Sequence, residues 1–185
     1  MKLAVLVCVF SSFGLYPAAS QAAPASAYAG QETRGIKALS AEEVDDLRAG
    51  KGMGLAKAAE LNGYAGPAHV LELADALELT SEQRAQTQAL KAAMTAQAIS
   101  LGHTVVAAER KLDLLFASKA VTPALLRSAL DEIGALQVRV RGVHLVAHLA
   151  QVAVLTSDQN ARYSQLRGYA GDATTAPKDR SQHKH

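Results

Sequence analysis

A five-residue helix-start pattern occurs twice in the sequence, as LTSEQ at residues 79–83 and as LTSDQ at residues 155–159. In each copy the Thr can cap a helix N-terminus, while the Gln three residues later reaches back to the N–H of the cap; this arrangement is a capping box. Thr122-Pro123 is a third start signal, because Pro fits the first position of a helix. These signals predict helices over residues 81–117, 123–154 and 157–166, with a turn at 118–121 and Gly168 as the final stop.

The composition favours the same fold class. Apolar residues make up 49% of the chain but aromatic residues only 4%, so the apolar weight comes from Ala and Leu, which are good helix formers. A β-sandwich or barrel would need Val, Ile, Thr and aromatic residues instead. We therefore expect an all-α chain: a long antiparallel helical hairpin with short flanking helices.

Apolar residues follow an alternating four- and three-residue spacing along both long segments, which is typical of packed helix pairs. The first segment carries Leu101, Val105, Ala108, Leu112 and Leu115, and the second carries Ala129, Ile133, Leu136, Val140, Val143, Ala147, Ala150 and Val154. The second segment has further apolar residues outside this seam, so its apolar surface is wider than one partner helix covers. We expect flanking helices or a second protomer to cover it, and we favour an intertwined homodimer.

The N-terminus has the pattern of an export signal. Lys2 is followed by the apolar run LAVLVCVF at residues 3–10 and then by small residues, so we expect residues 1–22 to be a cleaved signal peptide. A lipoprotein anchored through Cys8 is the alternative. Cys8 is the only cysteine, and after cleavage the chain would have no disulfide, thiolate nucleophile or cysteine-bound zinc.

The rest of the chain divides by composition. We expect a flexible leader at residues 23–50, with one or two helical turns at 42–47, and the hairpin domain at residues 51–170. Short helices are expected over 53–61 and 67–78. The glycine-rich residues 50–54 lack the strand and spacing of a phosphate loop, and we interpret them as a joint. A disordered tail with His183 and His185 is expected at residues 171–185.

Several classes of function are disfavoured. A net charge of +2, from 19 basic and 17 acidic residues, is too balanced for a nucleic-acid-binding protein. After signal cleavage no apolar run approaches the roughly 20 residues of a membrane span. The sequence has neither GxSxG nor HExxH, so we expect no enzyme.

The strongest candidate for chemistry is a histidine pair, His144 and His148. Their i, i+4 spacing places two imidazoles on one helix face, where they can bind one transition-metal ion. His69 and Glu72 are candidates for further ligands, and His103 and Glu109 are other possible donors. The alternative interpretation is that His144 and His148 only form hydrogen bonds across the helices.

Two LTxxQ pentapeptides occur in an exported, Cys-poor helical chain, together with the segment VHLVAHL at residues 143–149. By these features the chain resembles the Spy/CpxP family of periplasmic LTxxQ-motif proteins. The resemblance covers residues 53–169 and includes the heavy-metal-resistance sensor branch related to CnrX and ZraP. It implies a periplasmic stress-response protein that forms a cradle-shaped antiparallel dimer. Such a dimer would act as a chaperone for unfolded periplasmic proteins or bind a divalent metal, namely zinc, nickel or copper.

The sequence departs from the metal-sensor branch at one point. That branch combines histidines and a carboxylate with a methionine, but no methionine lies near His144 and His148 in the sequence. A different interpretation is a regulatory interaction module, which docks on an envelope sensor or signalling partner without metal or client.

Overall fold

The structure is a computed structural model that describes residues 25–169. The chain forms two units, and the boundary lies between residues 32 and 33. In the first unit the structure describes residues 25–32, which form turns and contain no helix or strand. Residues 33–169 contain six helices and no strand, which confirms the all-α prediction. The expected signal peptide at 1–22 and the tail at 171–185 lie outside the described residues.

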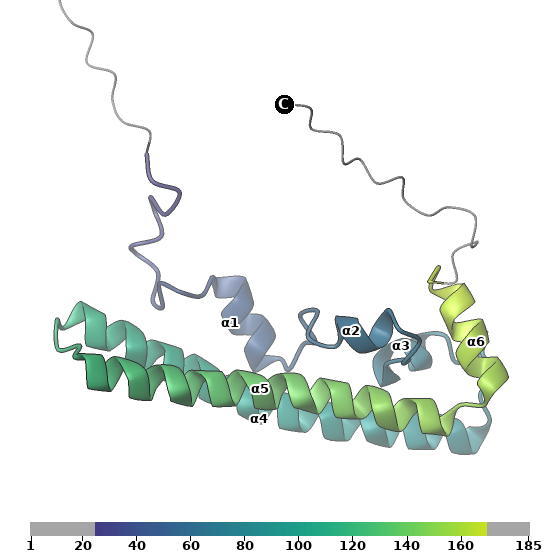
Figure 1. Cartoon of the computed structure of the whole chain (residues 1–185). Helices are drawn as coiled ribbons and strands as arrows, with labels where there is room; N and C mark the ends of the chain where they lie inside the picture. Colours follow the sequence, from purple (N-terminus) through teal and green to yellow (C-terminus); the bar gives the residue numbers. More distant parts are fainter. Residues whose placement is uncertain (1–24, 170–185) are drawn as a thin grey trace, which may run out of the picture. The chain divides into compact units, whose positions relative to one another are not determined.

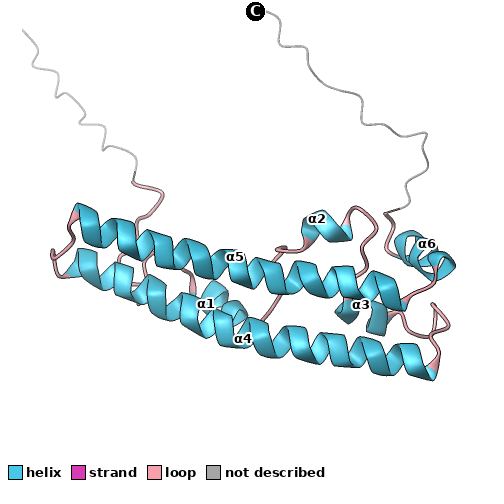
Figure 2. Ribbon diagram, turned by 60° about the horizontal axis from the view of Figure 1, so that its bottom comes forward, coloured by secondary structure: helices cyan, strands magenta, loops and turns pink. Residues whose placement is uncertain are grey.

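Two long helices form the predicted antiparallel hairpin. Helix α4 covers Ser81–Ala117 and helix α5 covers Pro123–Val154, and the two run side by side (Figures 1 and 2). With 37 residues at about 1.5 Å each, α4 is roughly 55 Å long. Helix α6, Ser157–Leu166, follows α5 directly. The bounds of all three helices agree with those that the sequence predicts.

The predicted start signals explain these bounds. The Thr80 and Thr156 side chains accept hydrogen bonds from the backbone N–H groups of Gln83 and Gln159, and both capping boxes are complete. Thr122 caps α5 in the same way, with Pro123 in the first turn. Gly168, with a φ of +71°, follows the end of α6, where the left-handed conformation favours glycine.

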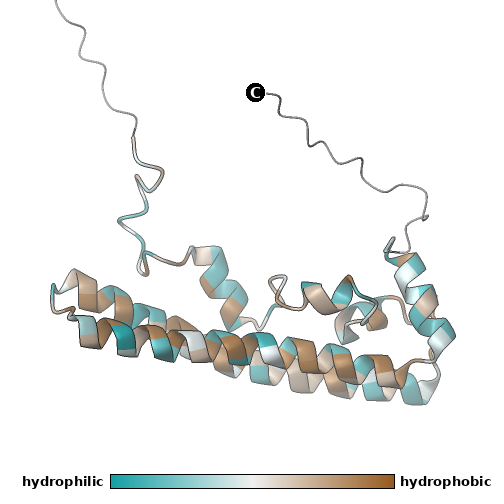
Figure 3. Ribbon diagram, in the orientation of Figure 1, coloured by the Kyte–Doolittle hydropathy of each residue, from teal (hydrophilic) through white to brown (hydrophobic). Residues whose placement is uncertain are grey.

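The core of the hairpin lies where the apolar spacing predicts it. One buried cluster joins the two long helices, and partly buried leucines extend it; its members are Val105, Ala108, Ile133, Leu136 and Val140, with Leu47, Leu55, Leu101 and Leu112 packed against them. Apolar residues continue along both helices in Figure 3. The expected seam between the long helices is therefore present in this part of the hairpin.

Helix α1, Ala41–Arg48, lies within the segment that we expected to be a leader. Ser40 caps it, and the Glu43 carboxylate accepts a hydrogen bond of 2.7 Å from the Ser40 N–H. The helix packs against α4, where Gly102 lies directly under the carbonyl group of Leu47. The predicted turns at 42–47 are therefore part of a capped helix that belongs to the same unit as the hairpin.

Helices α2, Lys57–Glu60, and α3, Pro67–Glu72, are shorter than predicted. No side chain caps the start of α2, and Met53 before it has a positive φ of 46°, so the expected helix over 53–61 does not begin at its first residue. Irregular turns follow α3 and end at Glu78, which has a φ of 53°. Propensity alone does not sustain such short helices.

A second core cluster lies where α3 and α6 meet the ends of the long helices. Its buried members are Ala65, Val70, Ala74, Leu77, Leu79, Leu155 and Tyr163. This cluster fixes the segment of residues 57–72 beside the C-terminal half of α5, and in this way it positions the candidate site. None of the helices within residues 25–169 combines the length and the apolar character that crossing a membrane requires.

Candidate functional site

An open pocket of about 630 Å³ brings together three of the four predicted site residues. His144 and His148 come from α5 and His69 comes from α3, and all three line the pocket. Glu72 is exposed and does not line it. His103 and Glu109, the other possible donors, lie outside the pocket as well.

The imidazole of His148 is buried and held in one orientation. Its Nδ1 lies 2.7 Å from the carbonyl oxygen of Tyr64, and since a carbonyl only accepts, Nδ1 carries the proton and donates. In the neutral ring this leaves the lone pair of Nε2 free. A hydrogen bond from the other ring nitrogen to a carbonyl is the usual support of a metal-binding histidine.

Gly66, at the start of α3, makes room for this ring. A Cβ atom at residue 66 would lie 2.7 Å from both Cε1 and Nε2 of His148, which is closer than nonbonded atoms approach. Any larger residue would therefore displace the imidazole.

His144 is also buried, and its Nε2 has no hydrogen-bond partner within the described residues. Its Nδ1 faces Gly52 in the glycine-rich segment. Burial lowers the pKa of His144, and the nearby His148 lowers it further, so the ring is neutral at pH 7. A buried polar atom without a partner costs about 1–3 kcal/mol, which a bound ligand would offset.

Glu60, on α2, is a member of the site that the sequence analysis missed. It is the carboxylate that lines the pocket, and its Oε1 accepts hydrogen bonds from the hydroxyl groups of Tyr163 and, at 3.1 Å, of Tyr169. Its Oε1 is 3.3 Å from His69 Nδ1, and its Oε2 is 3.6 Å from His148 Nδ1. Burial and the bond to Glu60 raise the pKa of Tyr163, so this phenol stays protonated and donates.

Two methionines that are distant in the sequence lie in the lining of this pocket. Met53 and Met94 line the same pocket as the histidine pair, although both are far from it in the sequence. Met53 precedes α2 and Met94 belongs to α4. The lining of this pocket therefore includes two methionines, although no methionine lies near residues 144–148 in the chain.

The arrangement offers a metal ion only part of a coordination shell. Within residues 25–169 no group of three or more His, Cys, Asp or Glu side chains is placed to hold a metal ion. The pocket is lined by His144 and His148, each with one ring nitrogen that has no hydrogen-bond partner among the described residues, and Glu60 lies beside His148 and His69. Two imidazole nitrogens suit a transition metal whose other positions are filled from outside the chain.

The lowered pKa of His144 predicts a pH effect on stability. Below about pH 6.5, the ordinary pKa of histidine, the unfolded chain binds a proton that the folded chain does not. The free energy of unfolding therefore decreases as the pH is lowered below this value. We expect His144→Asn to remove a slope of up to about 1.4 kcal/mol per pH unit in this range. Urea unfolding between pH 7.5 and 5.0 in the presence of a chelator measures it. The exposed His103→Asn is the control, and an equal loss of slope in both variants would contradict the assignment.

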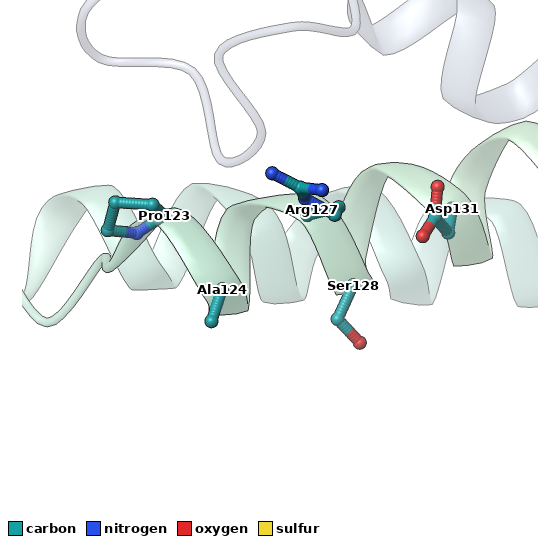
Figure 4. A pocket seen from close by; sticks show the side chains of 5 residues that line it. All are labelled: Pro123, Ala124, Arg127, Ser128 and Asp131. Atoms are coloured by element: carbon teal, nitrogen blue, oxygen red, sulfur yellow. The ribbon is translucent and has the colours of Figure 1, made fainter.

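Another hollow in the surface is less suited to a ligand. It is lined by Pro123, Ala124, Arg127, Ser128 and Asp131, all from the start of α5 (Figure 4). Because one helix supplies the whole lining, no second element encloses a ligand there.

Comparisons of the chain with models of protein families, with curated proteins and with solved structures find no match. Function is therefore argued from the site itself.

Proposed function

We propose that this protein is an exported, non-enzymatic stress- or metal-response protein of the Spy/CpxP type that binds a divalent transition-metal ion in the pocket beside α5. His144 and His148 bind the ion through Nε2, and Glu60 and His69 support them, whereas the sequence analysis named His69 and Glu72 as candidates for further ligands. Zinc, nickel and copper are the candidate metals, because imidazole suits all three.

One observation carries this proposal. The Nε2 of His144 is buried without a hydrogen-bond partner among the described residues, and His144 lines the same pocket as His148, whose Nδ1 bonds to the Tyr64 carbonyl. If these histidines served only to join helices, their ring nitrogens would be paired across the contact. Only the Nδ1 of His148 has such a partner within the described residues.

The test is calorimetric titration of zinc and nickel into the metal-stripped full chain. His183→Ala and His185→Ala are present throughout, so that the tail contributes no binding. We expect saturable binding that His144→Ala/His148→Ala weakens by at least about 100-fold, since both ligands are lost. Gly66→Ala should weaken it by about 10-fold, because its methyl group displaces the His148 ring without removing a ligand.

His103→Ala is the matched control, because this exposed histidine of α4 lies outside the pocket. Helix content by circular dichroism identifies variants that fail to fold. Metal binding that survives the double substitution, in protein of normal helix content, would refute the proposal.

A second candidate function is the binding of apolar segments of partly unfolded proteins. A groove between α4 and α5 is lined by nine residues, of which only Gln97 is polar: Leu90, Ala93, Met94, Gln97, Gly142, Val143, Val146, Ala147 and Ala150. Val146 in this lining is 63% exposed, and Leu149, which directly precedes Ala150 at the end of the lining on α5, is 59% exposed. An uncharged groove with exposed aliphatic residues fits an extended apolar peptide.

Suppression of the aggregation of a reduced, unfolding model protein tests this second function. We expect Val146→Ser/Leu149→Ser to reduce suppression several-fold, and Leu114→Ser, an equally exposed leucine on α4, to leave it unchanged. If the double variant alters only the sedimentation of the chain, the groove belongs to the proposed homodimer. If it alters only the capture of an envelope signalling protein, the regulatory-module hypothesis is favoured.

A further inference from the structure

The pocket beside α5 is much larger than a metal ion. Eighteen residues from the segment before α3, from α3 itself, from α4 and from α5 line its volume of about 630 Å³, and it is open to solvent. A single ion between two imidazoles fills only a small part of such a space. The remaining volume matches that of a small organic molecule.

The charges on the walls of the pocket favour an anion. Lys51, Lys57 and Lys91 line it, and Lys51 is paired with Asp46 at 2.6 Å. Neither Lys57 nor Lys91 forms an ion pair with an acidic residue of the described chain. Two unpaired ammonium groups repel a bare divalent cation and attract negative charge.

Glu60 does not cancel this excess of positive charge. It is the acidic residue among the lining residues; its Oε1 accepts hydrogen bonds from the Tyr163 and Tyr169 hydroxyl groups, while its buried Oε2 has no hydrogen-bond partner among the described residues. The guanidinium group of Arg167 lies 3.7 Å from its Oε1. One carboxylate that is already paired with this cation does not balance the two unpaired lysines.

The protein ligands are also too few. Transition metals take four to six ligands, whereas the described residues hold no group of three or more His, Cys, Asp or Glu side chains placed around one point. His144 and His148 supply two ring nitrogens that have no hydrogen-bond partner among the described residues. Oxygen ligands from a bound molecule would complete the shell and would bring the negative charge that the lysines lack.

We propose that the pocket takes its metal as a complex with a small multidentate carboxylate: the imidazoles of His144 and His148 bind the metal, and the ammonium groups of Lys57 and Lys91 bind the carboxylate. This inference rests on the proposed metal-binding function and names its ligand. Because the lysines bind the carboxylate, the pocket binds the metal complex more tightly than the free ion. Because the histidines bind the metal, it also binds the complex more tightly than the metal-free carboxylate.

Equilibrium dialysis with nickel and radiolabelled citrate tests the proposal on the full chain carrying His183→Ala and His185→Ala. Nickel and citrate are counted separately, alone and together. We expect each chain to retain one citrate per nickel when both are present, and at least tenfold less citrate when nickel is absent. Lys57→Gln/Lys91→Gln should reduce the retained citrate at least tenfold while nickel alone binds as before.

The matched control is Lys111→Gln/Lys119→Gln, which removes two exposed lysines outside the pocket and should change neither ligand. If nickel is retained without citrate when both are present, the inference is overturned and the proposed function is left intact. Citrate retained equally without nickel would overturn the inference too, because the anion would then bind by itself. If neither ligand is retained, the inference and the proposed metal function both fail.

Discussion

Replacing Gln83 by Glu is expected to reduce the free energy of unfolding by about 2–4 kcal/mol, although a Glu at this position is fully compatible with a capping box. The acid would even be favoured by the dipole of α4, because it lies in the first helical turn. A local view of the helix start therefore predicts a neutral or stabilising change, and the expected loss comes from a contact outside that helix.

That contact joins the two capping boxes. Gln83 Nε2 donates to the carbonyl oxygen of Val154 at 3.0 Å and to Gln159 Oε1 at 2.8 Å. Gln159 Nε2 in turn donates to the carbonyl oxygen of Leu77 at 3.1 Å and to Gln83 Oε1 at 3.1 Å. Each glutamine thus closes its own helix start and bonds to the other one.

Glu at position 83 loses both donated hydrogen bonds and places a charged oxygen against two acceptors. Gln159 cannot compensate by turning its amide, because its Oε1 accepts from the Thr156 N–H at 3.0 Å while its Nε2 donates to Leu77. Each unsatisfied group in this partly buried contact costs about 1–3 kcal/mol.

Urea unfolding followed by circular dichroism measures the effect. Gln88→Glu, on the exposed surface of the same helix, makes the same chemical change and should alter stability by less than about 0.5 kcal/mol. Because the two glutamines share partners, Gln83→Glu and Gln159→Glu should not be additive in a double-mutant cycle. Equal effects of Gln83→Glu and Gln88→Glu would show that the contact contributes nothing.

This pair of glutamines also shows which features of the fold are predictable from sequence. Each capping box is local, since Thr80 bonds to a residue only three positions away, and the bounds of the three long segments therefore follow from the sequence. The contact between Gln83 and Gln159 joins residues that are 76 positions apart. The repeated pattern predicts two helix starts, but it does not predict that the side chains of the two glutamines contact each other.

The candidate site divides in the same way. His144 and His148 are one turn apart on a helix, so their common face is predictable from spacing. Glu60 is a single acidic residue in a short helix without a side-chain cap, and no periodicity marks it as buried. Its partners Tyr163 and Tyr169 come from the other end of the chain, and the pairing depends on how α6 folds back. Glu72 has the better spacing from His69 but is exposed.

Replacing Gly102 by Ala is expected to destabilise the protein by about 1–3 kcal/mol, the usual cost of overpacking. A Cβ atom at this position would lie 1.9 Å from the carbonyl oxygen of Leu47 and 2.6 Å from its carbonyl carbon. Both atoms belong to the backbone of α1, so no rotation of a side chain relieves the clash, and α1 has to move away from α4.

The control for Gly102→Ala is Gly142→Ala in α5, where a Cβ atom meets nothing within 4 Å. Helix propensity alone makes Ala more stable than Gly by about 1 kcal/mol, so the two substitutions should change stability in opposite directions. Urea unfolding gives the sign, and trypsin cleavage after Arg48 reports whether α1 has detached. Stabilisation by both substitutions would mean that α1 does not pack on Gly102.

Movement of α1 should also reach the pocket beside α5 in which metal binding is proposed, because residues 49–54, which directly follow this helix, form part of its lining. Gly50 in this segment is packed against α4, where a Cβ atom would lie 3.0 Å from the backbone nitrogen of Ile99. Gly102→Ala should therefore weaken metal binding several-fold in calorimetry although it changes no ligand, whereas Gly142→Ala should leave it unchanged. Such a difference between the two variants would show that the packing of α1 on α4 holds residues 49–54 in place as one wall of the pocket.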